Sequence, residues 1–446
     1  MSNTRECADV KAALLDAREI DAAATRISGV VEATPLQFCP RLSADTGARV
    51  YLKREDLQVV RSFKIRGAYN LIVQLSDEER AAGVVCASAG NHAQGVAFAC
   101  RSMGIRGRIY VPSNTPRQKR DRILAHGAGF VELIATGETY DAAAEAAADD
   151  ARRTGATMVP PFDDPRTAAG QGTIAAEILD QLGEEPGTVI VPVGGGGLIA
   201  GIATYLHERS PATAIVGVEP SGAASMTAAL VAGAPVTLPE IDPFVDGTAV
   251  RRIGDLPYAV LSGLGVEVVS HSSLPLVTRT AAGAGNVTMT HADEGAVCTA
   301  LLGLYQNEGV IAEPSGALSV AALADLRVEP GSTVVCLISG GNNDVSRYGE
   351  ILERSLVHLG LKHYFLVNFP QEPGALRRFL GEVLGPEDDI TLFEYVKRNN
   401  RETGTALVGI ELGSADGING LLERMAASPM KVEQLEPGSP AYRYLI

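Results

Sequence analysis

The feature that most constrains this chain is a set of short, unbroken apolar runs between about residues 50 and 345. Ala-rich amphipathic stretches separate them, and six runs read as strands: 50–52, 84–87, 109–111, 189–193, 215–218 and 334–338. Continuous rather than alternating hydrophobicity is typical of parallel strands covered by helices on both faces. The pattern therefore predicts an α/β domain with a parallel sheet, whose ligands lie beyond the carboxyl ends of the strands.

One of the intervening helices has a recognisable start at residues 115–118. Thr115 is expected to cap this helix, with Pro116 at its first position and Gln118 at its third.

After about residue 354 the pattern changes. Residues 363–370 and 431–436 are strand-like, 373–384 and 417–428 are helical, and 390–398 with 404–413 alternate as a hairpin pair. This β-α-β-β-α-β order predicts a ferredoxin-like α+β domain. We place the domain boundary near residue 358, which gives domains at 1–358 and 359–446. Within the first, a smaller lobe is expected at roughly 52–158.

Composition excludes several classes of function. The chain carries 38 Lys and Arg against 53 Asp and Glu, a net charge of −15, and has no Trp, so nucleic-acid binding is not expected. The longest uncharged run, 189–206, contains Pro192 and four consecutive glycines, which argues against a membrane span. Six scattered cysteines without a CxxC pair favour reduced thiols over zinc or disulfides, and the N-terminus has no signal-peptide pattern. A cytoplasmic location is expected.

Lys64 lies in the segment SFKIRG at the start of a predicted helix. A lone lysine is usually a solvated surface charge. Lysine is also the side chain that forms a Schiff base when burial lowers its pKa. Phe63 beside it could pack on a flat ring.

The segment SAGNH, residues 88–92, joins a predicted strand to a helix. It could be an ordinary turn with a glycine bend and an Asn cap. Free N–H groups at such a helix start also bind anions, for example the carboxylate of a substrate.

Four consecutive glycines again lead from a strand into a helix, at residues 194–197. Each glycine costs about 0.5–1 kcal/mol relative to Ala in ordinary structure, so four together need a reason. Amides without Cβ atoms can surround a phosphate at the positive end of a helix dipole. The run lacks the Lys-Ser/Thr of a Walker loop and the spaced glycines of a dinucleotide fingerprint. A flexible turn is the alternative, and phosphate binding is favoured over it.

Ser339 follows the last apolar strand, in the segment SGGNND. This could be a Gly-rich turn, or it could present a neutral hydroxyl to a ring nitrogen. The four segments together supply what a pyridoxal-phosphate (PLP) enzyme needs.

The chain also resembles a known family over roughly residues 25 to 350. The motifs SFKIRGA, SAGNHAQGVA, VGGGGLIAGIA, EPSGA and SGGNND occur in the order found in biosynthetic threonine dehydratases (threonine ammonia-lyases), which are fold-type-II PLP enzymes of the tryptophan-synthase-β-like family. The segments HYFLVNFPQEPGALRRFL and ITLFEYVKRN resemble one copy of the ACT-like regulatory domain of these enzymes. The resemblance implies a two-lobed parallel-sheet catalytic domain followed by this ferredoxin-like domain.

The resemblance also implies roles for individual residues. Lys64 would carry PLP and, once released by the substrate, take the Cα proton. Asn91 would bond the ring hydroxyl, Phe63 would flank the ring and Ser339 would face the pyridine nitrogen. The phosphate would be bound by Gly194, Gly195, Gly196, Gly197 and Leu198. Gly247 and Glu313 are weaker assignments to the cofactor pocket. The substrate carboxylate would be held by Ser88, Ala89, Gly90, Asn91 and His92.

Two positions separate this chain from similar enzymes. Serine racemases carry a second Ser where Ala89 stands, so racemisation is not expected. The segment from Glu219 to Ser225 matches a cation-binding loop only in part, since Ser225 replaces an acidic ligand. We expect no divalent metal, and a monovalent cation at Glu219 stays open.

The leading hypothesis is PLP-dependent β-elimination of L-threonine to 2-oxobutanoate and ammonia, as a step of isoleucine synthesis. L-Serine is expected as a secondary substrate. A neutral Ser339 suits elimination, because it cannot keep the ring nitrogen protonated. Isoleucine would inhibit through the C-terminal domain and valine is a candidate activator; a structural or dimerising domain is the alternative. A homo-oligomer, dimer or tetramer, is implied by resemblance. Rival hypotheses are a serine or catabolic threonine dehydratase and a non-catalytic amino-acid sensor.

Overall fold

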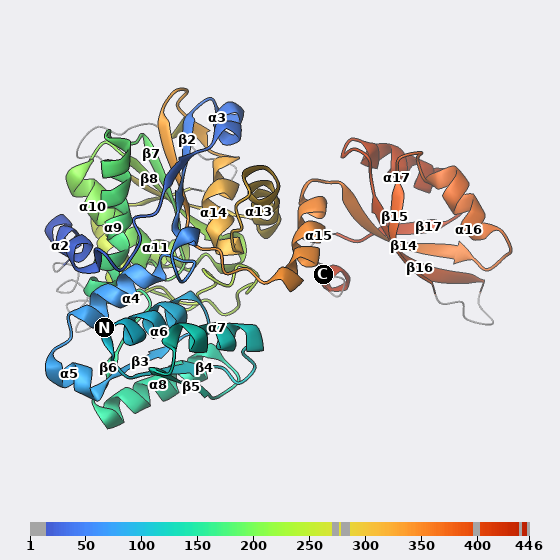
Figure 1. Ribbon diagram of the computed structural model, residues 1–446. Coiled ribbons are helices and arrows are strands. Elements are labelled where there is room, and N and C mark those ends of the chain that lie inside the picture. Colours follow the sequence, from blue (N-terminus) through green and yellow to red (C-terminus); the bar gives the residue numbers. More distant parts are fainter. Residues whose placement is uncertain (1–14, 270–275, 278–285, 396–401, 437–438, 444–446) are drawn as a thin grey trace. The chain divides into compact units, whose positions relative to one another are not determined.

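The computed structural model describes residues 15–269, 276–277, 286–395, 402–436 and 439–443 (Figure 1). The chain divides into two compact units, Met1–Asn343 and Asp344–Ile446. This division precedes helix α15 (Tyr348–His358), whereas the sequence pattern placed the boundary after that helix. The predicted extents of the domains and of the smaller lobe stay predictions.

The larger sheet of the first unit has seven strands in the order β1-β2-β13-β7-β8-β11-β9. Strand β1 is antiparallel to β2, and the other neighbours run parallel. Every residue of β7, β8 and β13 is buried, as the continuous apolar runs predicted. The strands are β1 (Leu36–Phe38), β2 (Arg49–Arg54), β7 (Thr188–Pro192), β8 (Ala214–Pro220), β9 (Glu267–Val268), β11 (Val287–Ala292) and β13 (Thr333–Ile338).

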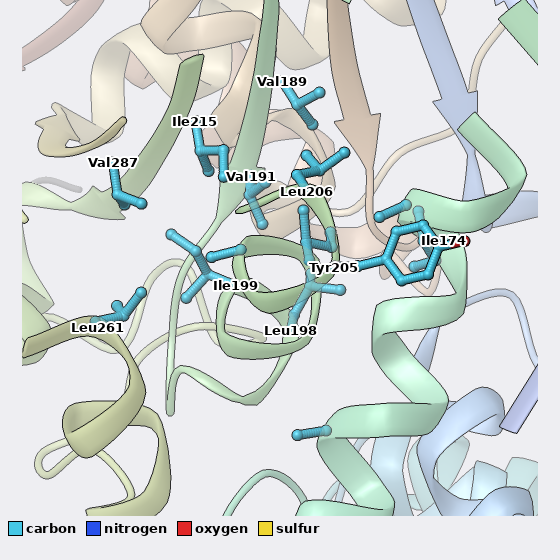
Figure 2. Close-up of a cluster of buried hydrophobic side chains, with 14 of the residues drawn as sticks. Ile174, Val189, Val191, Leu198, Ile199, Tyr205, Leu206, Ile215, Leu261 and Val287 are labelled. Atoms are coloured by element: carbon cyan, nitrogen blue, oxygen red, sulfur yellow. The ribbon is translucent and has the colours of Figure 1, made fainter. Parts of the chain in front are cut away.

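Helices cover both faces of this sheet (Figure 1). On one face lie α2 (Ala17–Ile27), α9 (Pro165–Leu182) and α10 (Gly197–Arg209), and on the other α13 (Glu294–Glu308) and α14 (Pro314–Leu323). Figure 2 shows Ile199 and Leu206 of α10 next to Val191 of β7, in the same hydrophobic cluster. Each such side chain contributes about 1.5–3 kcal/mol by leaving water, so the helix that follows the glycine run is held firmly.

A second, four-stranded parallel sheet has the order β5-β4-β3-β6. Helices α4, α6 and α7 lie on one face and α8 on the other (Figure 1). The strands are β3 (Val84–Ala87), β4 (Gly107–Val111), β5 (Val131–Ala135) and β6 (Thr157–Met158), and the helices are α4 (Lys64–Val73), α6 (Asn91–Met103), α7 (Arg117–Gly127) and α8 (Tyr140–Thr154). Among the described residues, this unit also contains α3 (Pro40–Thr46), α5 (Asp77–Ala82), α11 (Ser225–Ala232), α12 (Asp255–Leu264), β10 (Leu276–Val277), β12 (Arg327–Val328) and two 3-10 helices, Glu55–Leu57 and Ser221–Ala223.

The predicted start of α7 is wrong by one residue. Arg117 is its first helical residue, and Pro116, which has an extended backbone, is the N-cap. The Pro116 carbonyl accepts hydrogen bonds from the backbone N–H groups of Lys119 and Arg120. The Thr115 hydroxyl is buried without a partner among the described residues, so it does not cap the helix.

The second unit confirms the predicted ferredoxin-like plan. Its antiparallel sheet has the order β15-β16-β14-β17, and its elements follow the β-α-β-β-α-β sequence. They are β14 (Lys362–Pro370), α16 (Ala375–Arg378) continued by a π-helical turn at Phe379–Val383, β15 (Asp389–Tyr395), β16 (Thr403–Glu411), α17 (Gly417–Ala427) and β17 (Lys431–Gln434), before a short α18 (Pro440–Arg443). The predicted end of the third element, at residue 398, lies outside the described residues.

Two sequence-based expectations concern the chain as a whole. Five cysteines are free and buried: Cys39, Cys86, Cys100, Cys298 and Cys336. Cys7 lies outside the described residues. Within the described ranges, none of the helices is both long and apolar enough to cross a membrane.

The contact between α9 and α10 gives a test of the packing beside the glycine run. A Cβ at Gly201 would lie 2.7 Å from Gly172 N and closer still to Ala168 O. Gly201→Ala should therefore lower the free energy of unfolding by about 1–3 kcal/mol. Gly263→Ala is the control, because a Cβ in this part of α12 meets open space. This substitution should raise the free energy of unfolding by about 0.4–1 kcal/mol. Urea unfolding measures both; equal effects would contradict the packing described.

Candidate active site

Lys64 is the first residue of α4, and its amine faces the loop that follows β6. Lys64 Nζ donates to Pro161 O at 3.0 Å and lies 5.1 Å from the Phe63 ring centroid and 5.9 Å from that of Phe162. The side chain keeps some contact with solvent, yet the surrounding protein disfavours its charge. This desolvation lowers the pKa of Lys64 to about 8, although Glu313 opposes the shift. About one amine in ten is then neutral at pH 7.

A buried ionic network holds the start of α4 in place. Arg66 is fully buried and bonds Glu55 through Nε and Nη2, both at 2.8 Å, and Glu177 at 2.6 and 2.9 Å. Lys53, also fully buried, bonds Glu177 at 2.6 Å. Two positive charges balance two negative ones, and removing one partner of the fully buried Arg66–Glu55 pair would cost about 3–5 kcal/mol. The network fixes the helix turn that carries Lys64.

The glycine run follows β7 and leads into α10, with Gly196 as the N-cap and Gly197 as the first helical residue. Gly196 has φ of +91°, which favours glycine, and a Cβ on Gly195 or Gly197 would collide with Phe162. The first helical bond runs from Ala200 N to Gly196 O, and among the described residues no side chain caps this end. The N–H groups of the first turn therefore remain available to an anion. The Leu198 side chain packs in the core, so only its backbone can take the predicted role.

The amine and the uncapped helix end meet on the same short segment, residues 161–162. Lys64 contacts Pro161 and Phe162, and Gly195 and Gly197 pack against Phe162. Gln171 Nε2 also donates to Pro161 O, at 3.2 Å. A reactive amine and an uncapped helix start that contact the same two residues fit a cofactor that carries both an aldehyde and a phosphate, as PLP does.

Asn91 and Glu313 come together from two elements far apart in the sequence. Asn91 Nδ2 donates to Glu313 Oε1 at 2.7 Å, and Ser315 Oγ donates to the same oxygen at 2.7 Å. Burial raises the pKa of Glu313, and Asp246 adds to this shift. A Cβ on Gly247 would lie 3.2 Å from Glu313 Oε1 and would collide with Ser315 Oγ. The two weaker sequence assignments, Gly247 and Glu313, thus lie beside each other, and Glu313 also bonds Asn91.

Ser339 is the residue after β13 and is buried. Its hydroxyl donates to Ser315 O at 3.3 Å, and its carbonyl accepts from Phe63 N at 3.1 Å. This places the strand end next to the residue that precedes Lys64. Its predicted contact with a pyridine nitrogen stays a prediction.

The segment 88–92 turns from β3 into α6. Ser88 Oγ accepts from Gly90 N at 3.2 Å, and among the described residues the start of α6 has no side-chain cap. Ala89 packs its methyl against the core. His92 Nε2 lies 2.8 Å from Val159 O, and burial, with Lys64 nearby, lowers its pKa to about 3. His92 is therefore neutral, and only its backbone N–H remains for the predicted contact with a carboxylate.

Glu219 is buried at the end of β8, and its carboxylate receives helix N–H groups. Its two oxygens accept from Met226 N at 2.6 Å and Thr227 N at 2.9 Å, at the start of α11. Burial raises the pKa of Glu219 to about 7. No group of three or more His, Cys, Asp or Glu suited to a metal occurs among the described residues. The monovalent cation at Glu219 stays a prediction.

Sequence reasoning gave no role to several residues that the structure brings to the site. Phe162 and Gln171 approach from the loop after β6 and from α9, and Asn342 bonds Asn91. Asn342 lies inside the motif SGGNND, but its partners are distant in sequence. Nothing near Phe162 except a pair of prolines sets that loop apart.

Comparison with known proteins shows the family of the chain. The family model of pyridoxal-phosphate dependent enzymes matches residues 27–340, and that of the C-terminal regulatory domain of threonine dehydratase matches residues 353–445. A biosynthetic L-threonine dehydratase of Mycobacterium tuberculosis is 69% identical over 432 residues, 97% of this chain and 96% of the relative. One of Corynebacterium glutamicum is 60% identical over 437 residues, 97% and 96% of the two chains.

Solved structures show the same likeness over about three quarters of the chain. Processed threonine deaminase isoform 2 from tomato is 37% identical with a TM-score of 0.66, covering 76% of this chain and 94% of that one. Maize serine racemase is 30% identical with a TM-score of 0.66, covering 77% and 98%. Fold and site together define a fold-type-II PLP-dependent enzyme with a C-terminal regulatory domain. More narrowly, the chain belongs to the biosynthetic L-threonine dehydratase family.

The lowered pKa of Lys64 predicts how cofactor-free protein takes up PLP. The neutral amine attacks the aldehyde, so the rate of uptake should rise about tenfold per pH unit below pH 8 and level off above it. Stopped-flow absorbance of the bound cofactor measures this rate. A rate that keeps rising to pH 10 would show an amine with an ordinary pKa and contradict the desolvation argument.

Proposed function

We propose that this protein is a threonine ammonia-lyase, which removes the β-hydroxyl of L-threonine as water and releases 2-oxobutanoate and ammonia. The observation that carries the proposal is the meeting of the Lys64 amine with the uncapped start of α10 on residues 161–162. The names of the full-length relatives, biosynthetic L-threonine dehydratases, support threonine as the substrate.

Within this reaction, Lys64 moves the proton. When bound, PLP makes the Cα proton of the amino acid labile by taking up the electron pair left behind. Lys64 Nζ, with a pKa of about 8, accepts that proton at neutral pH and can release it again. The ionic network around Arg66 keeps the amine in one place while its charge changes.

Other residues bind and orient. The first-turn N–H groups of α10 hold the phosphate, and those of α6 hold the substrate carboxylate, each at the positive end of a helix dipole. His92, being neutral, adds no charge that would compete for the carboxylate. Ser339 offers a hydroxyl and not a carboxylate, so it does not stabilise a protonated ring nitrogen. This favours early loss of the β-hydroxyl over other fates.

The C-terminal unit supports a place in regulated biosynthesis. Its ferredoxin-like plan and its match to the threonine dehydratase regulatory domain support an amino-acid effector. The resemblance to biosynthetic dehydratases supports isoleucine as the feedback inhibitor, valine as a candidate activator and isoleucine synthesis as the pathway. Resemblance supports a homo-oligomer, a dimer or a tetramer. The five buried free thiols support the cytoplasm as its compartment.

A steady-state assay of oxo-acid release from L-Thr, L-Ser and D-Ser, with and without Ile and Val, tests the proposal. L-Thr should be turned over faster than L-Ser, by a margin of about 1–3 kcal/mol because one methyl group separates the two. D-Ser should not react, and Ile should inhibit. Lys64→Ala is the control, and should lose at least about 10²–10⁴-fold in rate.

Faster turnover of L-Ser without any response to Ile would replace the proposal with a serine or catabolic dehydratase. Amino-acid binding without any turnover, in protein loaded with PLP, would replace it with a sensor.

A further inference from the structure

Asn342 lies just beyond β13, and its amide has an orientation fixed from both ends. Arg122 Nη1 lies 3.3 Å from Asn342 Oδ1, and a guanidinium can only donate. Asn342 Nδ2 lies 2.8 Å from Val60 O, and a carbonyl can only accept. Neither neighbour can exchange roles, so Asn342 must keep its oxygen toward α7 and its nitrogen toward the loop before Lys64.

This orientation, together with the Glu313 carboxylate, fixes the orientation of Asn91. Asn342 Nδ2 also lies 2.8 Å from Asn91 Oδ1, so Asn91 must present its oxygen there. Its nitrogen then faces Glu313 Oε1 at 2.7 Å. The Glu313 carboxylate is held in place by two further hydrogen bonds, which it accepts from Ser315 Oγ at 2.7 Å and from the backbone N of Asn342 at 3.2 Å. Arg122, Asn342, Asn91 and Glu313 thus form a hydrogen-bonded chain with one direction of donation.

The consequence concerns what Asn91 can offer a ligand. One hydrogen of its Nδ2 goes to Glu313, and the second hydrogen is left as a donor. Were the amide reversed, Asn91 would turn its oxygen toward Glu313, two acceptors would face each other, and the ligand would lose an N–H group.

We propose that Asn342 is a positioning residue that fixes Asn91 as a hydrogen-bond donor to the ring oxygen of the cofactor. This rests on the proposed function, in which PLP lies beside Asn91. A donor at that place stabilises the ring oxygen in its deprotonated form. Asn342 touches neither cofactor nor substrate in this account, and acts through the Asn91 amide.

The test is the absorption spectrum of the bound cofactor, whose visible band reports a deprotonated ring oxygen and whose near-ultraviolet band a protonated one. Asn342→Asp nearly keeps the shape but replaces the donor with an acceptor. Asn91 should then turn its Nδ2 toward the new carboxylate, and Glu313, whose pKa burial already raises, should take a proton and donate to Asn91 Oδ1. The ratio of the visible to the near-ultraviolet band should fall at least about tenfold at neutral pH, the effect of losing one hydrogen bond to a charged oxygen.

Two further variants separate orientation from charge and from folding. Asn342→Leu removes the bond to Asn91 without adding charge, and should shift the ratio in the same direction by a smaller factor. Should Asn342→Asp fail to fold or to bind PLP, this variant carries the test. Asn307→Asp makes the same exchange on α13, where Asn307 bonds only the carbonyl of Gly303 in the described structure, and should leave the ratio unchanged.

Spectra of Asn342→Asp and Asn342→Leu that match the parental spectrum would overturn this inference alone. A parental protein that binds no PLP would overturn the proposed function and the inference with it.

Discussion

The chemistry of this protein depends on an amine that is desolvated yet held in a fixed position. Lys64 is shielded by two aromatic rings and a loop, which makes its charge less favourable. Without other contacts, burying that charge would destabilise the start of α4. Two residues further on, Arg66 joins Glu55 and Glu177 in the interior. Because the charges of the network balance, the network can hold α4 in place without using the reactive amine as one of its partners.

The carboxyl ends of two parallel sheets supply the rest of the site. The turn after β3 and the turn after β7 each open a helix without a side-chain cap, among the residues described, so each offers N–H groups to an anion. One end suits a carboxylate and the other a phosphate. The group of polar residues between them, Asn91, Glu313 and Asn342, joins elements of both sheets and is buried or half-buried. Binding groups and the reactive amine are therefore fixed by the same packing.

Much of this could be predicted from the sequence, because unbroken apolar runs and glycine-rich turns have direct physical causes. Strand β3 has the predicted bounds, and β13 differs by one residue. Strand β11 was missed because threonines and a histidine interrupt its apolar residues, although it pairs on both sides. Strand β5 was missed because it lies at a sheet edge and is half exposed.

The site was predicted less completely, because its contacts form only in the folded chain. Phe162 explains why glycines are needed at 195 and 197, yet no local pattern singles it out. The direction of the Asn91 amide follows from Arg122 and Val60, which act through Asn342. Local sequence records which groups are present, and tertiary packing decides which way they face.

The most direct test of the account is to locate the cofactor on the chain. Protein loaded with PLP would be reduced with borohydride, digested and examined by mass spectrometry. We predict one pyridoxyl adduct, on the peptide that contains Lys64. An adduct on Lys53, Lys119 or another lysine, or the absence of any adduct, would contradict it.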